Sequence, residues 1–422
     1  MTAASPDPNP VDPDTAHPGS PPRRLVAVAA VLVLVRVVVV GVLAFGPWTD
    51  EAGELAGWDI ERFQVVADLD GRPYVDQPVE YPPGSVVAIE LVAGGDLVTT
   101  HRVLAVASLL VDLAIAAALA RWWRPSTGVA YLLAGLPLVP MGYVRFDLWA
   151  TALAVLAAAA LVRNRVGATA AATTAGALVK VWPVMLVAAA VAVHRTRAAV
   201  VTVLTGAAAG IVWLAYAGGS LDPVDQVVSL RGATGWHVES LAGSLIALTT
   251  DATPTRQLDA FRIGTLDPRL VLLGRLATLA AVAGLVMLGR RGTGGTGPAG
   301  RARDELVVGA VTLGATAAMV VTAPLLSPQF LLWLTPWLAI VATSSADGAR
   351  AVTWASGIAI GLTGLVLAVW SPPELAGTAP ALLLLARDAA LVAVVVSTAR
   401  LLRRCGPPTT PAPDRAGTTA DG

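Results

Sequence analysis

Acidic and aromatic side chains alternate between residues 47 and 98, in a polar segment that separates two strongly apolar stretches. A carboxylate can act as the general base that deprotonates a hydroxyl nucleophile, and the candidates for this role are Asp59, Asp50 and Glu51. Aromatic rings stack on the apolar faces of sugars and carboxylates accept hydrogen bonds from hydroxyls, which makes sugar-binding candidates of Trp58, Asp76, Glu80 and Tyr81. A single loop acid is more often a solvated charge, so this interpretation depends on the whole group.

Three cations are candidates for stabilising the negative charge of a phosphate: Arg145, Lys180 and Arg231. Lys180 is the only lysine among 29 basic residues, and an ammonium is a more compact and more strongly hydrated charge than a guanidinium. The composition therefore indicates that a point charge is required at this position. The alternatives are an interfacial anchoring pair for Arg145 with Asp147 and a snorkelling ammonium for Lys180.

Further polar and aromatic residues interrupt the apolar pattern near helix boundaries. Pro328 breaks a helix and allows the Gln329 amide to point into a cavity. We predict that sugar or acceptor binding also involves Asp147, Trp182, His237, Glu239, Gln329 and Trp333.

The composition identifies the environment in which these residues must lie. Hydrophobic residues make up 55% of the 422 residues and charged residues 14%, whereas soluble domains carry about a quarter charged residues. The chain is therefore predicted to be an integral membrane protein. Its net charge of +0 provides no basic field for nucleic acid. One cysteine and four histidines without metal-site spacing predict no disulfide and no metal.

Apolar stretches long enough to cross a bilayer occur throughout the chain, some of them only with local thinning, near residues 25–46, 99–120, 126–143, 147–162, 198–217, 269–289, 305–323, 329–345, 351–370 and 380–400. Residues 166–193 are too many for one span and too few for two full spans, and Pro183 interrupts them. They predict a hairpin of two short helices with Lys180 at its turn. We therefore expect an all-α polytopic bundle of about twelve membrane segments.

Arginines in alternate connections predict the topology, because cytoplasmic loops carry an excess of basic residues. They place both termini in the cytoplasm and the site on the extracytoplasmic side of the cell membrane. Two long outer loops, 47–98 and 218–268, are expected to carry interfacial helices at 84–92 and 241–248. Residues 23–404 form one membrane-embedded domain in this interpretation, between disordered cytoplasmic tails at 1–22 and 405–422.

Two charges are predicted to lie inside the membrane. Arg36 is near the middle of the first span and Asp112 near the middle of the second, where an unpaired charge costs about 2.5–3.5 kcal/mol. The two spans are joined by an outer loop and should pack antiparallel. We therefore predict a structural ion pair between Arg36 and Asp112.

Seven different short motifs follow one another along the chain, and the region they characterise extends from about Leu25 to Arg400. They are Trp58-Asp59 to Phe63, Gly71-x-Pro73-Tyr74-x-Asp76, Val79-Glu80-Tyr81-Pro82-Pro83-Gly84, Arg145-Phe-Asp147, Lys180-x-Trp182-Pro183, Trp236-x-x-Glu239-Ser240-Leu241 and Ser327-Pro328-Gln329. In this order the sequence resembles the actinobacterial polyprenyl-phosphate-mannose-dependent mannosyltransferases of the GT-C superfamily.

The resemblance implies a GT-C-like membrane glycosyltransferase that takes a hexose, expected to be mannose, from a polyprenyl-phosphate-sugar donor. The acceptor is expected to be an envelope lipid or glycan on the extracytoplasmic side. The family's aspartate position matches Asp59, whereas Asp50-Glu51 is similar to the acidic pair of other GT-C branches, so both assignments of the base stay open. With cations at the phosphate, the expected reaction inverts the anomeric centre and needs no metal or cofactor.

Two other classes fit parts of the sequence. A transporter or lipid flippase also has about twelve helices, but the 166–193 hairpin has no counterpart after residue 269 of the kind that repeated transporter halves contain. A non-catalytic scaffold for envelope enzymes would leave the acids of the first outer loop without a chemical role.

Overall fold

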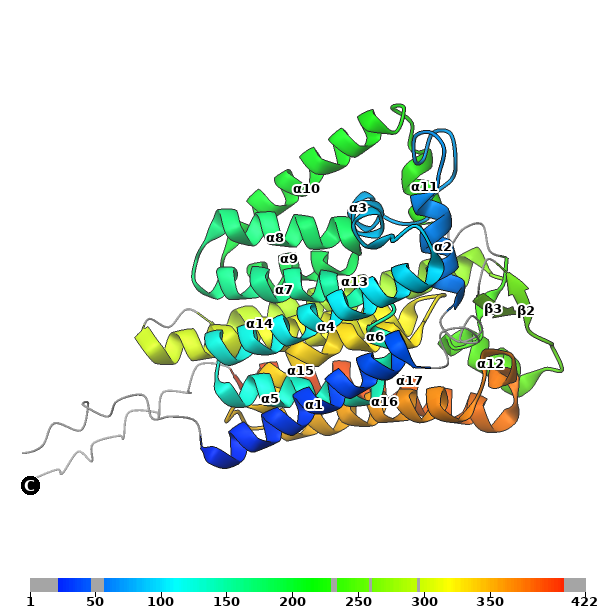
Figure 1. The fold of residues 1–422 in the computed structure, drawn as a ribbon. Coiled ribbons are helices and arrows are strands. Elements are labelled where there is room, and N and C mark those ends of the chain that lie inside the picture. Colours follow the sequence, from blue (N-terminus) through cyan, green and yellow to red (C-terminus); the bar gives the residue numbers. More distant parts are fainter. Residues whose placement is uncertain (1–21, 47–56, 229–233, 258–259, 294–296, 406–422) are drawn as a thin grey trace, which may run out of the picture.

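The computed structural model describes residues 22–46, 57–228, 234–257, 260–293 and 297–405 (Figure 1). Within these residues seven helices are long and apolar enough to cross a membrane: α1 (Arg23–Phe45), α4 (Leu97–Trp122), α10 (Thr196–Tyr216), α13 (Pro268–Gly292), α14 (Gly297–Thr322), α16 (Ala349–Val369) and α17 (Thr378–Arg404). The prediction of an all-α polytopic membrane protein is confirmed.

Shorter helices occupy the remaining predicted segments, namely α5 (Pro125–Gly135), α7 (Asp147–Val162), α8 (Val166–Val179), α9 (Met185–Ala192) and α15 (Thr335–Ala342). The predicted hairpin is present as α8 and α9. Lys180 ends α8 in an extended conformation, and Pro183 lies in the 3-10 turn η5 (Trp182–Val184) that leads into α9. The α8–α9 turn therefore presents Lys180 at a helix end.

Helix α14 is the centre of the bundle, and it packs against α7, α9, α13, α15 and α17. Within a membrane-length stretch of 18 residues, 83% of α14 is buried inside the protein. The corresponding share for α13 is 6%, so α13 lies at the periphery. Glycines allow this close packing: a Cβ at Gly309 would lie 2.8 Å from Ile340, and one at Gly314 would lie 2.8 Å from Leu285.

The connecting segments gather at one end of the bundle (Figure 1). They contain α2 (Gly57–Ala67), α3 (Pro83–Val92), α11 (Asp222–Val228), α12 (Leu241–Thr249) and a small antiparallel sheet of order β1-β3-β2. The sheet pairs β1 (Trp236–His237), β3 (Ala260–Ile263) and β2 (Thr255–Gln257). The sequence did not predict it, because strands of two to four residues are too short to show an alternating pattern. Helices α3 and α12 occupy the two positions predicted for interfacial helices.

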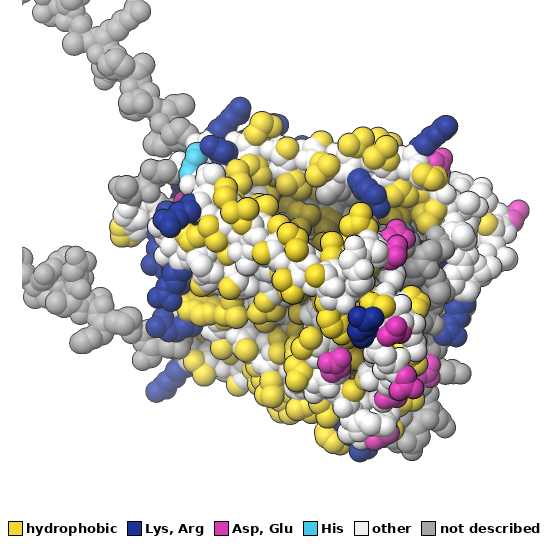
Figure 2. Space-filling view, turned by 90° about the horizontal axis from the view of Figure 1, so that it is seen from above, with side chains coloured by type: hydrophobic (Ala, Val, Ile, Leu, Met, Phe, Trp, Pro, Cys, Tyr) yellow, Lys and Arg dark blue, Asp and Glu magenta, His cyan; other side chains and the backbone are white. Residues whose placement is uncertain are grey.

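Charge is distributed unevenly between the two ends of the bundle. Figure 2 shows most visible arginines and lysines at one end and most visible acids at the other. At the basic end α1 begins, and α4, α13 and α17 end, with arginines. The site residues described below come from the acidic end.

Arg36 and Asp112 lie in contact inside the bundle, as the sequence predicts, with Arg36 Nε 2.8 Å from Asp112 Oδ2. The Asp112 carboxylate also accepts hydrogen bonds from the hydroxyls of Tyr131 and Tyr143. Arg36 additionally donates to the carbonyl of Leu132, at 2.6 Å. This network joins α1, α4 and α5 to the turn that carries Tyr143, and that turn continues directly into Arg145.

Candidate active site

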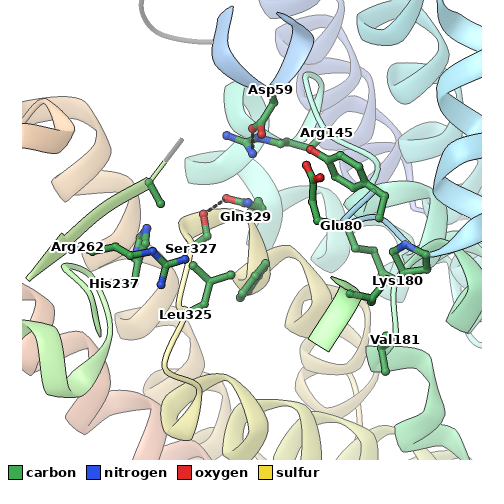
Figure 3. Close-up of a pocket in the computed structure, with 15 residues that line it drawn as sticks. Asp59, Glu80, Arg145, Lys180, Val181, His237, Arg262, Leu325, Ser327 and Gln329 are labelled. Carbon is green, nitrogen blue, oxygen red and sulfur yellow. Dashed lines mark hydrogen bonds and ion pairs between the residues drawn. The ribbon is translucent and has the colours of Figure 1, made fainter. Parts of the chain in front are cut away.

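A cavity of about 270 Å³ opens at the acidic end of the bundle, between α2, the segment before α3, the α8–α9 turn, the small sheet and the 3-10 helix η7 (Pro328–Leu334). Figure 3 shows side chains from these separate segments around it. The predicted site residues that line it are Asp59, Glu80, Tyr81, Arg145, Lys180, His237 and Gln329. Packing therefore assembles residues that are up to 270 positions apart in the sequence.

Asp59 and Arg145 form an ion pair at one wall of the cavity (Figure 3). Asp59 lies in the first turn of α2, where a carboxylate is favoured by the helix dipole. Arg145 lies in the turn between α6 (Val139–Gly142) and α7. Their side chains are 15% and 24% exposed, so both can still reach a ligand in the cavity.

Lys180 lies on the same side of the cavity, above a buried acid. The Lys180 Nζ is 3.8 Å from Asp147 Oδ2, which is too long for a hydrogen bond. Trp333 Nε1 donates to the other oxygen of Asp147 at 2.7 Å and so fixes the carboxylate. Asp147 is fully buried, and within the described residues its Oδ2 accepts no hydrogen bond, so this carboxylate oxygen faces Lys180 across the 3.8 Å gap.

Glu80 is held by Arg62, a residue one turn after Asp59 on α2. Arg62 donates from Nε at 2.9 Å and from Nη2 at 2.7 Å, which is a bidentate pair. The sequence analysis did not single out Arg62, because its role depends on the loop that returns Glu80 to α2.

The opposite wall is formed by the small sheet, where His237 on β1 and Arg262 on β3 are register partners. Burial, with a smaller contribution from the Arg262 and Arg387 charges, lowers the pKa of His237 to about 3. The imidazole is therefore neutral near pH 7 and can exchange hydrogen bonds with hydroxyls. Gln329 lines the cavity nearby and accepts a hydrogen bond from Ser327 at 2.6 Å.

Trp182 and Trp333 were predicted to take part in sugar or acceptor binding, but neither lines the cavity. They lie beneath it in an aromatic column, with ring centroids 5.5 Å apart and planes 15° apart. Phe330, which does line the cavity, stacks on Trp333 at 4.3 Å, and Trp337 packs against Trp182 from below. Trp182 is 1% exposed and Trp333 6% exposed, so both indole rings lie in the protein interior, and Phe330 connects their stack to the cavity.

Asp76 and Glu239 also lie away from the cavity. The Asp76 carboxylate accepts a 2.6 Å hydrogen bond from the Arg72 amide and so closes a local turn. Glu239 is buried beside Arg387 of α17, whose guanidinium also contacts Asp388 at 2.9 Å. Burial raises the pKa of Glu239 to about 7, and the negative charge of Asp388 adds to this rise, while the Arg387 guanidinium opposes it.

Other predicted residues lie outside the described part of the chain. These are Asp50, Glu51 and Arg231, together with the side chain of Trp58. In the described residues no group of three or more His, Cys, Asp or Glu side chains could hold a metal ion.

Several lining residues were missed by the sequence analysis. Arg262 stands in a short strand without a recognisable motif, and only the strand pairing with His237 brings it to the cavity. Ser327 was part of a quoted motif, but nothing in its sequence context indicated that it would bond Gln329.

No protein-family model matches the sequence, and no curated protein matches it. Two solved structures are similar to it, both of ArnT from Cupriavidus metallidurans. The apo structure shares 16% identity with a TM-score of 0.41 and covers 90% of this chain and 77% of that one. The structure bound to undecaprenyl phosphate shares 17% identity with a TM-score of 0.42 and covers 89% of this chain and 77% of that one.

Proposed function

We propose that the protein is a membrane-embedded glycosyltransferase that transfers a hexose from a polyprenyl-phosphate-sugar donor to a hydroxyl of an envelope lipid or glycan. One observation carries the proposal: an acid, Asp59, shares one cavity with two cations, Arg145 and Lys180, at the end of a membrane bundle. This combination suits a hydroxyl nucleophile and a phosphate leaving group.

The cations stabilise the leaving group in this mechanism. Cleavage of the sugar–phosphate bond adds negative charge to the phosphate, and Lys180 and Arg145 supply positive charge on the same side of the cavity. Asp147 attracts the ammonium but does not accept a hydrogen bond from it, since Lys180 Nζ and Asp147 Oδ2 are 3.8 Å apart. The ammonium can therefore donate its hydrogen bonds to the phosphate. Lys180 and Arg145 therefore bind the phosphate before and during its departure.

Donor binding also prepares the base. The Asp59–Arg145 ion pair must open before the carboxylate can accept a proton from the acceptor hydroxyl. A donor phosphate competes for Arg145 and releases Asp59 when the sugar is in place. The acceptor oxygen then attacks the anomeric carbon in line with the phosphate, forming the new glycosidic bond with inversion while Asp59 takes the hydroxyl proton. Asp50 remains the rival base.

The remaining lining residues position the sugar. Glu80 accepts hydroxyl hydrogen bonds, Gln329 and the neutral His237 exchange them, and the rings of Tyr81 and Phe330 present apolar surface. Mannose is the expected hexose because the motifs resemble mannose-dependent enzymes. The excess of arginine at the opposite end of the bundle supports an extracytoplasmic site with both termini in the cytoplasm (Figure 2).

The test is a transfer assay with purified full-length protein in liposomes, given labelled polyprenyl-phosphate-mannose and an extract of envelope lipids and glycans. We expect label in a glycosylated product with wild-type protein and a much lower rate of label transfer with Asp59→Asn. Labelled donor that crosses the bilayer without forming any product would favour a flippase and overturn the proposal.

A further inference from the structure

A second hollow lies between α13 and α17, away from the candidate active site and toward the basic end of the bundle. It has a volume of about 400 Å³. Its apolar lining comes mainly from Ala281, Gly284 and Leu288 of α13 and from Val395, Val396 and Ala399 of α17. Several of these side chains are small, so they leave space between the two helices. We call this feature the α13–α17 groove.

Two arginines of α17, Arg400 and Arg403, line one end of the groove. They are three residues apart and so project from the same helix face. Both are exposed, and within the described part of the chain neither guanidinium has a hydrogen bond or ion pair with a protein group. A cation at the end of an apolar groove is complementary to an anionic group attached to an apolar chain.

The dimensions of the groove fit one chain of a membrane lipid. The lining residues of α13 extend from Ala281 to Leu288, a rise of about 10 Å along the helix axis. This is roughly two thirds of one leaflet of a hydrocarbon core about 30 Å thick. Only 6% of the membrane-length stretch of α13 is buried inside the protein, so most of this helix surface is open to the bilayer.

We propose that the α13–α17 groove binds an anionic glycerophospholipid of the leaflet at the basic end, with its phosphate on Arg400 and Arg403 and one acyl chain along Gly284. Basic pockets between membrane helices recognise anionic headgroups in this way. The site is separate from the cavity that would take a polyprenyl-phosphate donor, because the two lie toward opposite ends of the bundle.

A bound lipid would join a peripheral helix to one that supports the cavity. Helix α17 also carries Arg387, which contacts Glu239 beside the small sheet. Arg387 is 13 residues before Arg400, about 20 Å along the same helix. A lipid that fixes the basic end of α17 against α13 therefore stabilises the helix whose Arg387 contacts Glu239.

The experiment measures lipid binding and does not depend on transfer activity. Full-length protein in neutral detergent is titrated with phosphatidylglycerol or phosphatidylcholine, and binding is followed by native mass spectrometry and by thermal unfolding. We expect phosphatidylglycerol to bind at least fivefold more tightly than phosphatidylcholine and to raise the Tm. Inorganic phosphate alone should leave the Tm unchanged, because it lacks the acyl chain.

Two variants test the two halves of the site. Arg400→Gln with Arg403→Gln removes the charge, and Gly284→Leu places a side chain in the groove, at a position where an added Cβ meets no atom within 4 Å. Both should lose the preference for phosphatidylglycerol. The matched controls are Arg23→Gln with Arg24→Gln at the basic end of α1, and Gly361→Leu on α16, where a Cβ also meets nothing within 4 Å.

Loss of the preference in the groove variants alone supports the proposal. An unchanged preference in those variants, or an equal loss in the α1 control, would overturn it by showing general attraction to a basic surface. If a variant does not fold, photoactivatable phosphatidylglycerol is cross-linked to the wild-type protein. Adducts on α13 and α17 support the site, and adducts confined to other helices contradict it.

Discussion

The Asp59 carboxylate pairs with Arg145 in the cavity, and in the proposed mechanism this pairing couples the base to phosphate binding. Asp59→Asn keeps the shape of the side chain but cannot take a proton. Because a general base contributes typically 10²–10⁴-fold, we expect kcat to fall by about that factor while donor binding stays measurable. Single-turnover transfer and donor titration measure the two effects separately.

The control for this variant is Asp68→Asn, an exposed acid just after the same helix, which should leave kcat unchanged. If Asp59→Asn transfers sugar at the normal rate and Asp50→Asn does not, the base is Asp50. The positions of Arg145 and Lys180 would still be consistent with phosphate binding.

Lys180 ends α8 in an extended conformation, and its Nζ lies 3.8 Å from Asp147 Oδ2. A guanidinium is longer and planar, so Lys180→Arg should lower kcat even though charge is kept. Lys180→Ala should lower it further, by about 10²–10³-fold, because one stabilising charge is lost. Arg269→Ala, at an exposed position at the start of α13, is the matched control. Normal kinetics in both Lys180 variants would exclude this residue from the phosphate site.

Glu239 and His237 make opposite contributions to the dependence of stability on pH. The pKa of buried Glu239 is raised from 4.5 to about 7, so the folded state binds more protons than the unfolded state within this window. Stability from this group therefore falls as pH rises from 4.5 to about 7. The pKa of His237 is lowered from 6.5 to about 3, so its contribution rises with pH between about 3 and 6.5.

We expect the Tm of wild type relative to Glu239→Gln to decrease as pH rises through the Glu239 window. The Tm relative to His237→Asn should change in the opposite direction through its own window. Thermal unfolding in a pH series measures both differences. A difference between wild type and Glu239→Gln that is constant with pH would show that Glu239 has no raised pKa.

At the scale of the elements, the contact between α3 and α8 brings two parts of the cavity lining together. Gly84 ends the Glu80-Tyr81-Pro82-Pro83-Gly84 motif, and a Cβ there would lie 2.7 Å from the backbone of Leu178. Ser85 Oγ donates to the carbonyl of Val179, directly before Lys180. The motif therefore places the loop with Glu80 against the helix end that presents Lys180.

Gly84→Ala should separate α3 from α8, because backbone atoms cannot move aside as a flexible side chain does. We expect a lower Tm and a several-fold loss of transfer activity. Gly167→Ala in the first turn of α8 meets nothing within 4 Å and serves as the control. Unchanged activity in Gly84→Ala would mean that this contact does not position the cavity.

At the scale of the whole molecule, the uneven distribution of charge predicts the orientation in the membrane (Figure 2). The expectation is that Thr250, in the connection after α12, faces outward and that Ser345, between α15 and α16, faces the cytoplasm. In a Cys405→Ala background, an impermeant maleimide should label Thr250→Cys in intact cells. It should label Ser345→Cys only after permeabilisation, and the reverse pattern would invert the topology.

The sequence by itself determined the membrane segments, the α8–α9 hairpin and the residues that can do chemistry. These features depend on local properties: apolar length sets a span, proline ends a helix, and a lone lysine is visible in the composition. The Arg36–Asp112 pair was also predictable, because two charges inside neighbouring spans have few partners within reach.

Only the tertiary structure decided which of these residues meet. Arg262 reaches the cavity through a strand too short to predict, and Arg387 reaches Glu239 from 148 positions away. Trp182 is turned inward by stacking on Trp333, although its place in the sequence is equally compatible with a cavity wall. The physical reason is that contacts between distant segments depend on the packing of whole helices, and local patterns do not specify side-chain direction at the turns between them.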